Sequence, residues 1–537
     1  MDRRTLLAAG TGITAAAAMT AGCDDGKSGA ATGRTAPTGD TTATGTSVRT
    51  RSAAPGAAAG KPRTADWTAL GRGLKGDLVR PGDSDYTTAR QLYNTRFDAL
   101  RPAAVAYIGN TSDIAECLAF ARRHGVPVAI RNGGHSYAGW SSGNGRLVVD
   151  VSALASVRTT ADGATIGAGA KLIDVYTRLG AHGVTIPAGS CPTVGISGLT
   201  LGGGHGVVSR AYGLTSDSLT GARIVTADGR TLDVSKDREA DLFWALRGAG
   251  NGNFGVVTEL RFRTHEAAPG VTAYMTWPWS KATALLRSWQ DWGPSRPDEI
   301  WSSLHLSAAP GRTPTVSVSC FSLGTYGDLQ NAVDNLADRA GGPGPASRVS
   351  LRRRGYLEAM RMYAGCSSAS TTQCHLPGST PGRSAGGILR RETYAARSDF
   401  FDRSLDAAGI RALLAQAERY GRRTSGGGAV AIALTALGGA VNRVSPTATA
   451  FVHRRSRFLA QYTASWPAGG SGSVQTAWLD GAHTAMRRYA SGRAYQNYTD
   501  ATLKDWRTAY YGTAADRLTK LKKRYDPDRL FDFPQAL

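Results

Sequence analysis

The sequence predicts an α+β protein of two domains, and three observations support this fold class. The chain has 537 residues, enough for two or three domains. As far as about residue 267, short apolar strands alternate with helices and feed glycine-rich loops. From about residue 268, long helices alternate with strands such as 315–322 and 429–437, which is typical of a domain built on a largely antiparallel sheet.

In the first part, apolar periodicity and turn residues predict each element in turn. The hairpin is indicated by Asp228-Gly229, a strong turn signal between two apolar runs. The predicted elements are helix 113–124, strands 126–130, 146–151 and 165–169, helix 172–182, hairpin strands 222–226 and 231–234, helix 241–246 and strand 256–263. In the second part, the predicted helices are 279–292, 326–340 and 409–420, and the last sixty residues return to a mixed pattern.

The amino terminus resembles an export signal. An Arg3-Arg4 pair precedes a weakly apolar run, and residues 1–23 are therefore interpreted as a twin-arginine-type signal. Thr20-Ala21-Gly22-Cys23 resembles a lipoprotein cleavage site and makes Cys23 a candidate for lipidation; free secretion and a cytosolic tail are the alternatives. Residues 24–65 are rich in Gly, Ala, Thr, Ser and Pro and predict a disordered linker. The protein is thus expected outside the cytoplasmic membrane, as a surface lipoprotein or secreted.

The formal net charge of +22 does not indicate a nucleic-acid partner. The basic residues are scattered and no known nucleic-acid motif is present. A solvated basic surface near an anionic envelope explains the charge. No other segment reads as transmembrane, so contact with a membrane is expected only through Cys23.

The cysteines predict one disulfide. Cys366 and Cys374 are eight positions apart in a loop-like stretch, a spacing that permits a disulfide in an oxidising compartment; two buried thiols are the alternative. Cys117 and Cys320 lie in apolar surroundings and are expected to be core thiols. No metal site is expected, because the spacings of His135, Cys191 and His205 are not those of zinc ligands.

Two reactive side chains stand in glycine-rich loops. His135 follows Gly133-Gly134, and Cys191 lies in 187–195, just before the glycine run 202–206. Both side chains are nucleophilic enough to bond a reactive cofactor carbon, and glycines let backbone N–H groups approach phosphates. A hydrogen-bonded loop histidine and a small core cysteine are the alternatives. Neither a phosphate loop nor a Rossmann fingerprint is present, which favours a nucleotide-type cofactor held by dispersed loops.

These motifs resemble the berberine-bridge-enzyme-like oxidases of the vanillyl-alcohol-oxidase superfamily. Gly133-Gly134-His135-Ser136 and Cys191-Pro192-Thr193-Val194-Gly195 carry the resemblance, and 398–401, 452–454, 495–498 and 526–531 extend it. It implies a PCMH-type FAD-binding domain at 66–267, a substrate domain at 268–475, and a segment at 476–537 that completes the FAD domain. It also implies FAD bound at two residues, by His135 to the flavin 8-methyl carbon and by Cys191 to C6.

The same resemblance assigns the remaining site residues. Tyr498 would take the hydroxyl proton of the substrate, with a packing aromatic as the alternative, and Tyr137 would line the site. His205 is also expected at the cofactor, where a packing or supporting role is favoured over direct contact. The other residues expected at the cofactor are Arg131, Asn132, Gly133, Gly134, Ser136, Thr193, Val194, Gly195, Gly198, Gly202, Gly252, Asn253, Gly255, Val256 and Asn497.

The expected activity is oxidation of an alcohol or hemiacetal carbon, with transfer of a hydride to FAD and reoxidation by O2 to H2O2. Residues 442–450 lack the glutamate of the plant alkaloid-forming members, which disfavours amine chemistry, and Val194 is small, which favours oxygen access. A saccharide is the favoured substrate, with Trp277, Trp279 and Trp301 as candidate platforms, although such residues are more often core residues. The alternatives are a hydroxylated aromatic or polyketide substrate, a dehydrogenase with a non-oxygen acceptor, and a binding protein on an oxidase fold.

Overall fold

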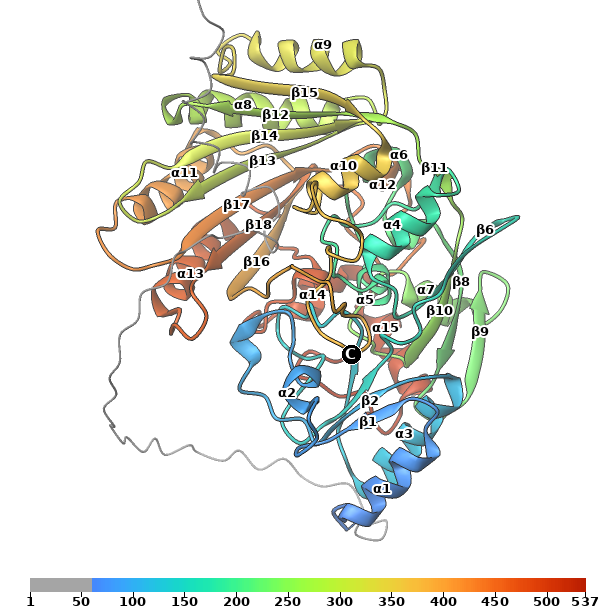
Figure 1. Cartoon of the computed structure of the whole chain (residues 1–537). Helices are drawn as coiled ribbons and strands as arrows, with labels where there is room; N and C mark the ends of the chain where they lie inside the picture. Colours follow the sequence, from blue (N-terminus) through green and yellow to red (C-terminus); the bar gives the residue numbers. More distant parts are fainter. Residues whose placement is uncertain (1–59) are drawn as a thin grey trace, which may run out of the picture.

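The computed structural model describes residues 60–537 (Figure 1). The signal predicted at 1–23, with Cys23, and most of the linker predicted at 24–65 lie outside the described residues. The predicted linker runs slightly too far, because α1 (Thr64–Gly73) begins within it. Its Trp67 and Leu70 are buried in the core, which explains why order begins there. Within residues 60–537, no helix has the length and apolarity needed to cross a membrane.

A four-stranded sheet forms one side of the first part. Its order is β1 (Asp77–Val79), β2 (Ala104–Tyr107), β4 (Leu147–Asp150) and β3 (Val128–Arg131). The last three are parallel, so their carboxyl ends meet at one edge. Helix α3 (Thr111–His124) contributes its apolar face to the core beside them. The loop that carries His135 leaves β3 at this edge.

A five-stranded antiparallel sheet forms the other side. Its order is β5 (Val157–Thr160), β6 (Gly163–Gly167), β10 (Val256–Phe262), β8 (Leu219–Val225) and β9 (Thr231–Ser235). The hairpin predicted around Asp228-Gly229 is confirmed, with β8 paired to β9 and a φ of 86° at Gly229. The other elements here are α2 (Tyr86–Ala89), α4 (Leu172–Gly180), β7 (Val184–Thr185), α5 (Ile196–Leu201), α6 (Ser209–Tyr212), α7 (Ala240–Leu246) and β11 (His265–Glu266).

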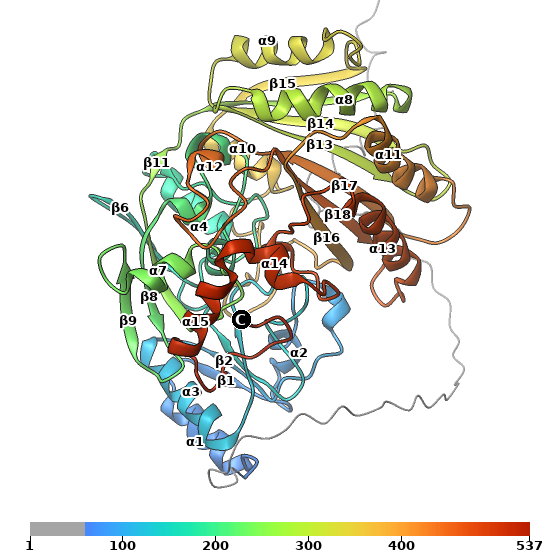
Figure 2. The same cartoon turned by 180° about the vertical axis from the view of Figure 1, so that it is seen from behind.

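A seven-stranded antiparallel sheet builds the second part and confirms the predicted α+β class. Its order is β15 (Arg348–Arg354), β12 (Gly270–Trp277), β14 (Thr315–Ser322), β13 (Ile300–Ala308), β17 (Ala429–Ala436), β18 (Phe458–Ser465) and β16 (Tyr394–Phe401). One face is covered by α8 (Ala282–Trp292), α9 (Tyr326–Ala337), α11 (Ala407–Gly421) and α13 (Ser473–Arg487), as Figure 2 shows from behind. Residues of β13, β17 and β18 alternate between this apolar core and the opposite face.

The carboxyl-terminal segment returns to the first part. Helices α14 (Trp506–Tyr511) and α15 (Ala515–Tyr525) share their apolar core with residues from 67 to 262. Helix α13 instead packs on β16 and β18 of the seven-stranded sheet. The return therefore follows α13, later than the boundary predicted at 475, because the apolar face of α13 matches the seven-stranded sheet.

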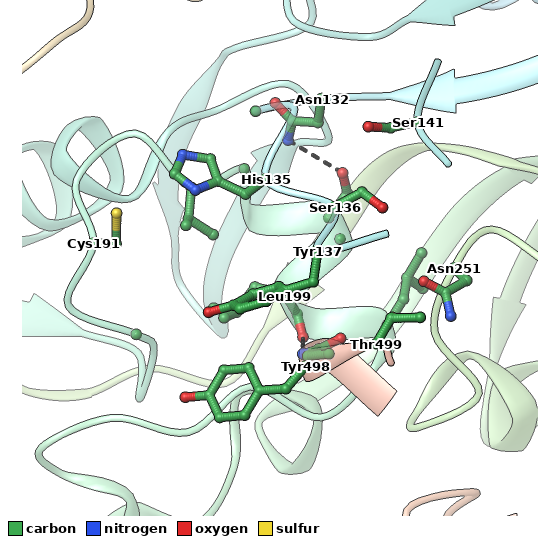
Figure 3. Close-up of a pocket in the computed structure, with 18 of the residues that line it drawn as sticks. Asn132, His135, Ser136, Tyr137, Ser141, Cys191, Leu199, Asn251, Tyr498 and Thr499 are labelled. Carbon is green, nitrogen blue, oxygen red and sulfur yellow. Dashed lines mark hydrogen bonds between the residues drawn. The ribbon is translucent and has the colours of Figure 1, made fainter. Parts of the chain in front are cut away.

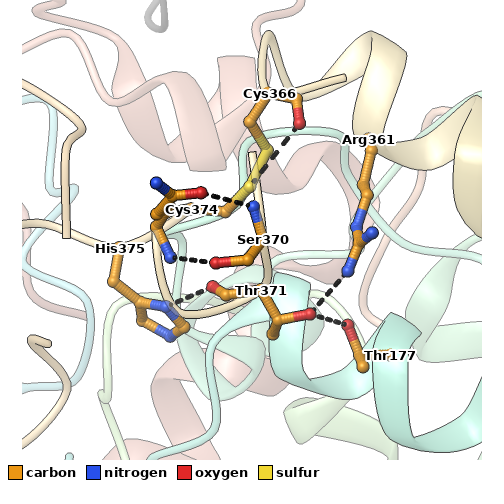
Figure 4. The surroundings of a disulfide bond; sticks show 8 residues. Thr177, Arg361, Cys366, Ser370, Thr371, Cys374 and His375 are labelled. Atoms are coloured by element: carbon orange, nitrogen blue, oxygen red, sulfur yellow. Dashed lines mark hydrogen bonds between the residues drawn. A yellow bond between two sulfur atoms is a disulfide. The ribbon is translucent and has the colours of Figure 1, made fainter. Parts of the chain in front are cut away.

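The predicted disulfide between Cys366 and Cys374 is confirmed, with 6.1 Å between the Cα atoms (Figure 4). The bridged loop follows α10 (Tyr356–Tyr363) and shares a small buried cluster with Ile173 of α4. Cys117 and Cys320 are buried free thiols, as predicted.

Candidate active site

A cavity of about 330 Å³ lies between the glycine-rich loops and the seven-stranded sheet. Its wall includes most of the predicted site residues, among them His135, Cys191, Tyr137 and Tyr498 (Figure 3). These come from segments up to 363 positions apart, so the fold converges on this space. The cavity is the candidate active site.

The His135 loop is anchored where β3 and β4 end. Arg131, the last residue of β3, forms a buried ion pair with Asp150, the last residue of β4. Asp150 also accepts a hydrogen bond from the backbone N–H of Ser152 at 2.8 Å. Because Arg131 and Asp150 are in register on parallel strands, their pairing fixes the start of the loop. His135 is only four residues further along the chain.

The imidazole of His135 is neutral and held in place. Its ring stacks on Tyr93 with centroids 4.0 Å apart, and its Nε2 is 2.8 Å from Thr193 Oγ1. Burial, aided by the charge of Lys171, lowers the pKa of His135 to about 3. The ring is therefore unprotonated at neutral pH, and the Thr193 contact leaves Nδ1 for a partner in the cavity. A neutral imidazole is the form that acts as a nucleophile.

The Cys191 loop packs directly against the His135 loop. A Cβ added at Gly133 would come within 2.6 Å of Gly195 N and Thr193 O. Glycine is thus required at this crossing of two backbones, in addition to any role towards a ligand. The contact brings His135 and Cys191 to one side of the cavity, as Figure 3 shows.

Tyr498 and His205 form a hydrogen-bonded pair on the cavity wall. Tyr498 ends the 3-10 turn Gln496–Tyr498, and its Oη is 2.8 Å from His205 Nε2. Burial raises the pKa of Tyr498 well above its ordinary value and lowers that of His205 to about 4. At neutral pH the pair therefore consists of a phenol that donates and an imidazole that accepts. His205, expected at the cofactor in a packing or supporting role, is the direct hydrogen-bond partner of Tyr498.

Neighbouring groups fix the position of Tyr498. Its ring lies 5.3 Å from that of Tyr137, whose Oη accepts a hydrogen bond from Gln461 Nε2 at 2.9 Å. Asn497, which lines the cavity as predicted, donates through its amide to Leu199 O and to Tyr495 Oη, each at 2.9 Å. The turn at Gln496–Tyr498 therefore contacts both the glycine-rich loops and a residue that is bonded to the seven-stranded sheet.

The opposite wall is a polar, uncharged face of the seven-stranded sheet. It presents alternate residues of three adjacent strands: Trp301, Ser303 and His305 of β13, Ala433 and Thr435 of β17, and Gln461 of β18. The pKa of His305 is lowered by burial to about 4, so its ring is neutral as well. Of the described residues that line the cavity, Asp532 alone carries a carboxylate, and Arg529 hydrogen-bonds it at 2.8 Å.

Some predicted residues lie off the cavity wall, and some lining residues were missed. Gly202, Asn253 and Val256 are buried behind it, and Thr193 acts through the ring of His135. Trp277 and Trp279 face away from the cavity, with their indoles bonded to Gly344 and Glu418. The sheet residues His305, Thr435 and Gln461 were not predicted to line the site. Polar residues at every second position of an otherwise apolar strand are the pattern that indicates them.

The cavity fits a flavin nucleotide. The wall contains two buried polar atoms without a protein partner, Ser141 Oγ and Trp301 Nε1. Because buried polar atoms are normally hydrogen-bonded, these two can bond a polar ligand. The loops at 131–136 and 189–198 line the same space with glycines whose backbone N–H groups can meet phosphates. His135 and Cys191, both in this wall, are the residues able to bond a flavin carbon.

Comparison with known proteins identifies the chain's relatives. A family model described as "FAD binding domain" matches residues 102–235, and one described as "Berberine and berberine like" matches 494–537. An FAD-linked oxidoreductase of Bacillus subtilis, YgaK, is 30% identical over 470 residues, 86% of this chain and 97% of the relative. A chitooligosaccharide oxidase of Gibberella zeae is 29% identical over 469 residues, 83% and 89% of the two chains.

Among solved structures, a xylooligosaccharide oxidase from Myceliophthora thermophila in complex with xylobiose superposes with a TM-score of 0.74 at 27% identity. The match covers 88% of this chain and 98% of that one. The similarity therefore extends over both parts of the fold and includes the cavity between them.

Proposed function

Because the chain belongs to the berberine-bridge-enzyme-like family of FAD-linked oxidoreductases and is itself an oxidoreductase of CH–OH groups, we propose that it oxidises the anomeric carbon of a neutral mono- or oligosaccharide. The observation that supports this substrate class is the uncharged polar sheet face opposite His135 and Cys191. Hydroxyl groups of a sugar match Ser303, Thr435 and Gln461. A cationic amine would find no free carboxylate, since Asp532 is paired with Arg529.

His135 and Cys191 are the proposed attachment points of FAD, one bond to each. The neutral His135 ring, held by Thr193 and Tyr93, presents its remaining nitrogen to the cavity. Two covalent bonds would keep the cofactor in an exported protein. When bound, FAD supplies the acceptor for a hydride from the substrate carbon.

Tyr498 and His205 together accept the proton of the substrate hydroxyl. The Tyr498 Oη takes this proton while its own passes to His205 Nε2, which lies 2.8 Å away. A phenol whose pKa is raised by burial is not ionised at neutral pH, so the two transfers occur together as the hydride leaves. Tyr137, which accepts a hydrogen bond from Gln461, packs against the Tyr498 ring and helps to hold it at the cavity wall.

Dioxygen is the proposed final acceptor, with hydrogen peroxide as the product; the small side chain of Val194 in the cavity wall supports this choice. An anaerobic titration tests substrate and acceptor together. The purified protein is mixed with neutral mono- and oligosaccharides, aromatic alcohols and amines while flavin absorption is recorded, and air is then admitted. Bleaching by saccharides and rapid recovery with peroxide support the proposal. Bleaching only by aromatic alcohols or amines contradicts it, and slow recovery in air identifies a dehydrogenase.

We also propose that residues 1–23 direct export and that Cys23 receives a lipid, a proposal that rests on the sequence pattern alone. Fractionation of cells that express the full chain tests it. The wild-type chain should enter the membrane fraction, and Cys23→Ala should release it without blocking export. A wild-type chain that stays in the cytoplasm contradicts the proposal.

A further inference from the structure

Lys171 is a deeply buried lysine whose ammonium group forms no ion pair with any carboxylate of the described residues, although the charges of Asp150 and Asp174 act on it from a distance. Its side chain donates to Asn132 Oδ1 at 2.6 Å, Ser152 Oγ at 3.0 Å and Gly169 O at 3.1 Å. The residue is 4% exposed; of the described lysines, only Lys522 is also buried. Burying an ammonium group is costly, so its retention here calls for a role.

The backbone of Lys171 holds the Cys191 loop. Lys171 pairs with Gly195 in an isolated antiparallel bridge. On either side of this bridge, Leu172 N donates to Val194 O and Ile196 N donates to Ala170 O, each at 3.0 Å. The segment that follows Cys191 is therefore laid along residues 170–172.

The side chain of Lys171 holds the His135 loop. Asn132, three residues before His135, donates through Nδ2 to Ala168 O and, at 3.2 Å, to Ser197 Oγ. This leaves Oδ1 of Asn132 as the acceptor that Lys171 fills. Ser152 Oγ, a second acceptor of Lys171, donates to Asn132 O at 3.0 Å. One residue thus joins both loops, its backbone to one and its side chain to the other.

We propose that Lys171 is a positioning residue for the double attachment of FAD, setting the relative placement of His135 and Cys191. The inference rests on the proposed function, which assigns one bond to each of these residues. Its ammonium charge near the His135 imidazole also favours the neutral, nucleophilic ring. Each attachment would exchange one C–H bond of the flavin, together with the N–H of His135 or the S–H of Cys191 in its thiol form, for one N–C or S–C bond. Two protons and two electrons are released, and dioxygen accepts them to form hydrogen peroxide.

The test is the covalent state of the flavin in Lys171→Met, measured on the full chain. Intact mass spectrometry after denaturation gives the fractions of chain with flavin attached and free, and peptide mapping resolves the two bonds. The matched control is Lys522→Met, which removes the other buried lysine. Lys522 donates to Asn253 O, Asp526 Oδ2 and Phe531 O, away from both loops.

We expect the doubly attached fraction to fall at least about five-fold in Lys171→Met, with folded protein recovered, and to stay at the wild-type level in Lys522→Met. A doubly attached fraction in Lys171→Met equal to that of wild type overturns the proposal, as does an equal loss in both variants. If Lys171→Met does not fold, Lys171→Gln is judged by the same criterion. Wild-type protein without covalent flavin contradicts the proposed function itself, whereas attachment that survives Lys171→Met contradicts only the role of Lys171.

Discussion

At the scale of single residues, the contact between Tyr498 and His205 determines where a substrate proton can go. The 2.8 Å separation and the partial burial of both side chains favour transfer to the imidazole over release to solvent. A base that is neutral when the substrate arrives can accept one proton and must return it later. The pH dependence of the reaction should therefore report on His205.

Replacing His205 by Gln should slow flavin reduction at neutral pH by about 10²-fold, the lower end of a general acid–base contribution. In the wild type, the rate should fall as pH drops through about 4, because His205 is then protonated and cannot accept. The variant should lack this acid limb. Anaerobic stopped-flow absorbance across the pH range measures both effects.

His305→Gln is the matched control for that experiment. His305 is buried, its pKa is also lowered to about 4, and it lines the same cavity from β13. Its replacement should weaken substrate binding and raise KM while leaving the acid limb in place. An acid limb that disappears in His305→Gln and persists in His205→Gln would show that the proton does not pass to His205.

The place of a single residue in the cavity was predictable where the residue belongs to one short sequence motif. His135 and Cys191 stand in compact glycine-rich motifs, and the cavity contains both. The partnership of His205 and Tyr498, 293 positions apart, depends on the return of the carboxyl terminus to the first part and could not be read from local pattern. The same holds for Lys171, whose three acceptors come from separate loops.

At the scale of elements, the seven-stranded sheet sets the shape of the substrate wall by its register. Ala433 lies opposite His305 on one neighbouring strand and opposite Gln461 on the other. A small side chain between two larger polar ones leaves a slot, because adjacent strands are about 4.8 Å apart. A sugar ring can enter this slot with a polar side chain on either edge.

Filling the slot should therefore obstruct the substrate. Ala433→Leu is expected to raise KM for the saccharide at least about tenfold, equivalent to about 1.4 kcal/mol of lost binding. Ala431→Leu is the control, since Ala431 lies two residues earlier on the same face of β17 but not in the cavity wall. Steady-state peroxide assays measure the KM of both variants. An unchanged KM in Ala433→Leu would show that the substrate does not enter the slot at Ala433.

The disulfide loop is a second element with a measurable effect. It packs on α4, where His375 Nε2 lies 3.0 Å from Asp174 Oδ2. Thr371 Oγ1 of the loop lies 3.2 Å from Thr177 Oγ1 of α4 (Figure 4). Replacing Cys366 and Cys374 together by Ser should lower the free energy of unfolding by about 2–3 kcal/mol, the loop-closure contribution of so short a ring. Denaturant unfolding measures it.

Reductant supplies the control for the disulfide. It should bring the wild type to the stability of the double variant and leave the variant unchanged. Equal stability of oxidised wild type and variant would mean that the loop is held by its packing on α4 alone.

Elements were predicted well where amphipathic periodicity was strong, as in α3, β14 and the β8–β9 hairpin. Strands β13 and β18 were not predicted individually, because polar residues that face the cavity interrupt their apolar pattern. The end of the second part was placed too early, since the helical pattern of α13 does not indicate which sheet it covers. Only the packing of Trp478 and Met486 on the seven-stranded sheet decides that.

At the scale of the whole molecule, function depends on bringing two separately built walls together. The glycine loops present His135 and Cys191, the seven-stranded sheet presents a neutral polar face, and the carboxyl-terminal turn places Tyr498 between them. No single part holds a complete site. The central claim is that this shared cavity brings a substrate hydroxyl to Tyr498 beside the bound flavin.

The most direct test of that claim is the rate of anaerobic flavin reduction in Tyr498→Phe. The phenylalanine keeps the packing against Tyr137 and Tyr495 and removes only the hydroxyl that contacts His205. The account predicts wild-type flavin content, an unchanged dissociation constant for the saccharide, and reduction slower by about 10²- to 10⁴-fold. Reduction at the wild-type rate in a variant with full flavin content would contradict it.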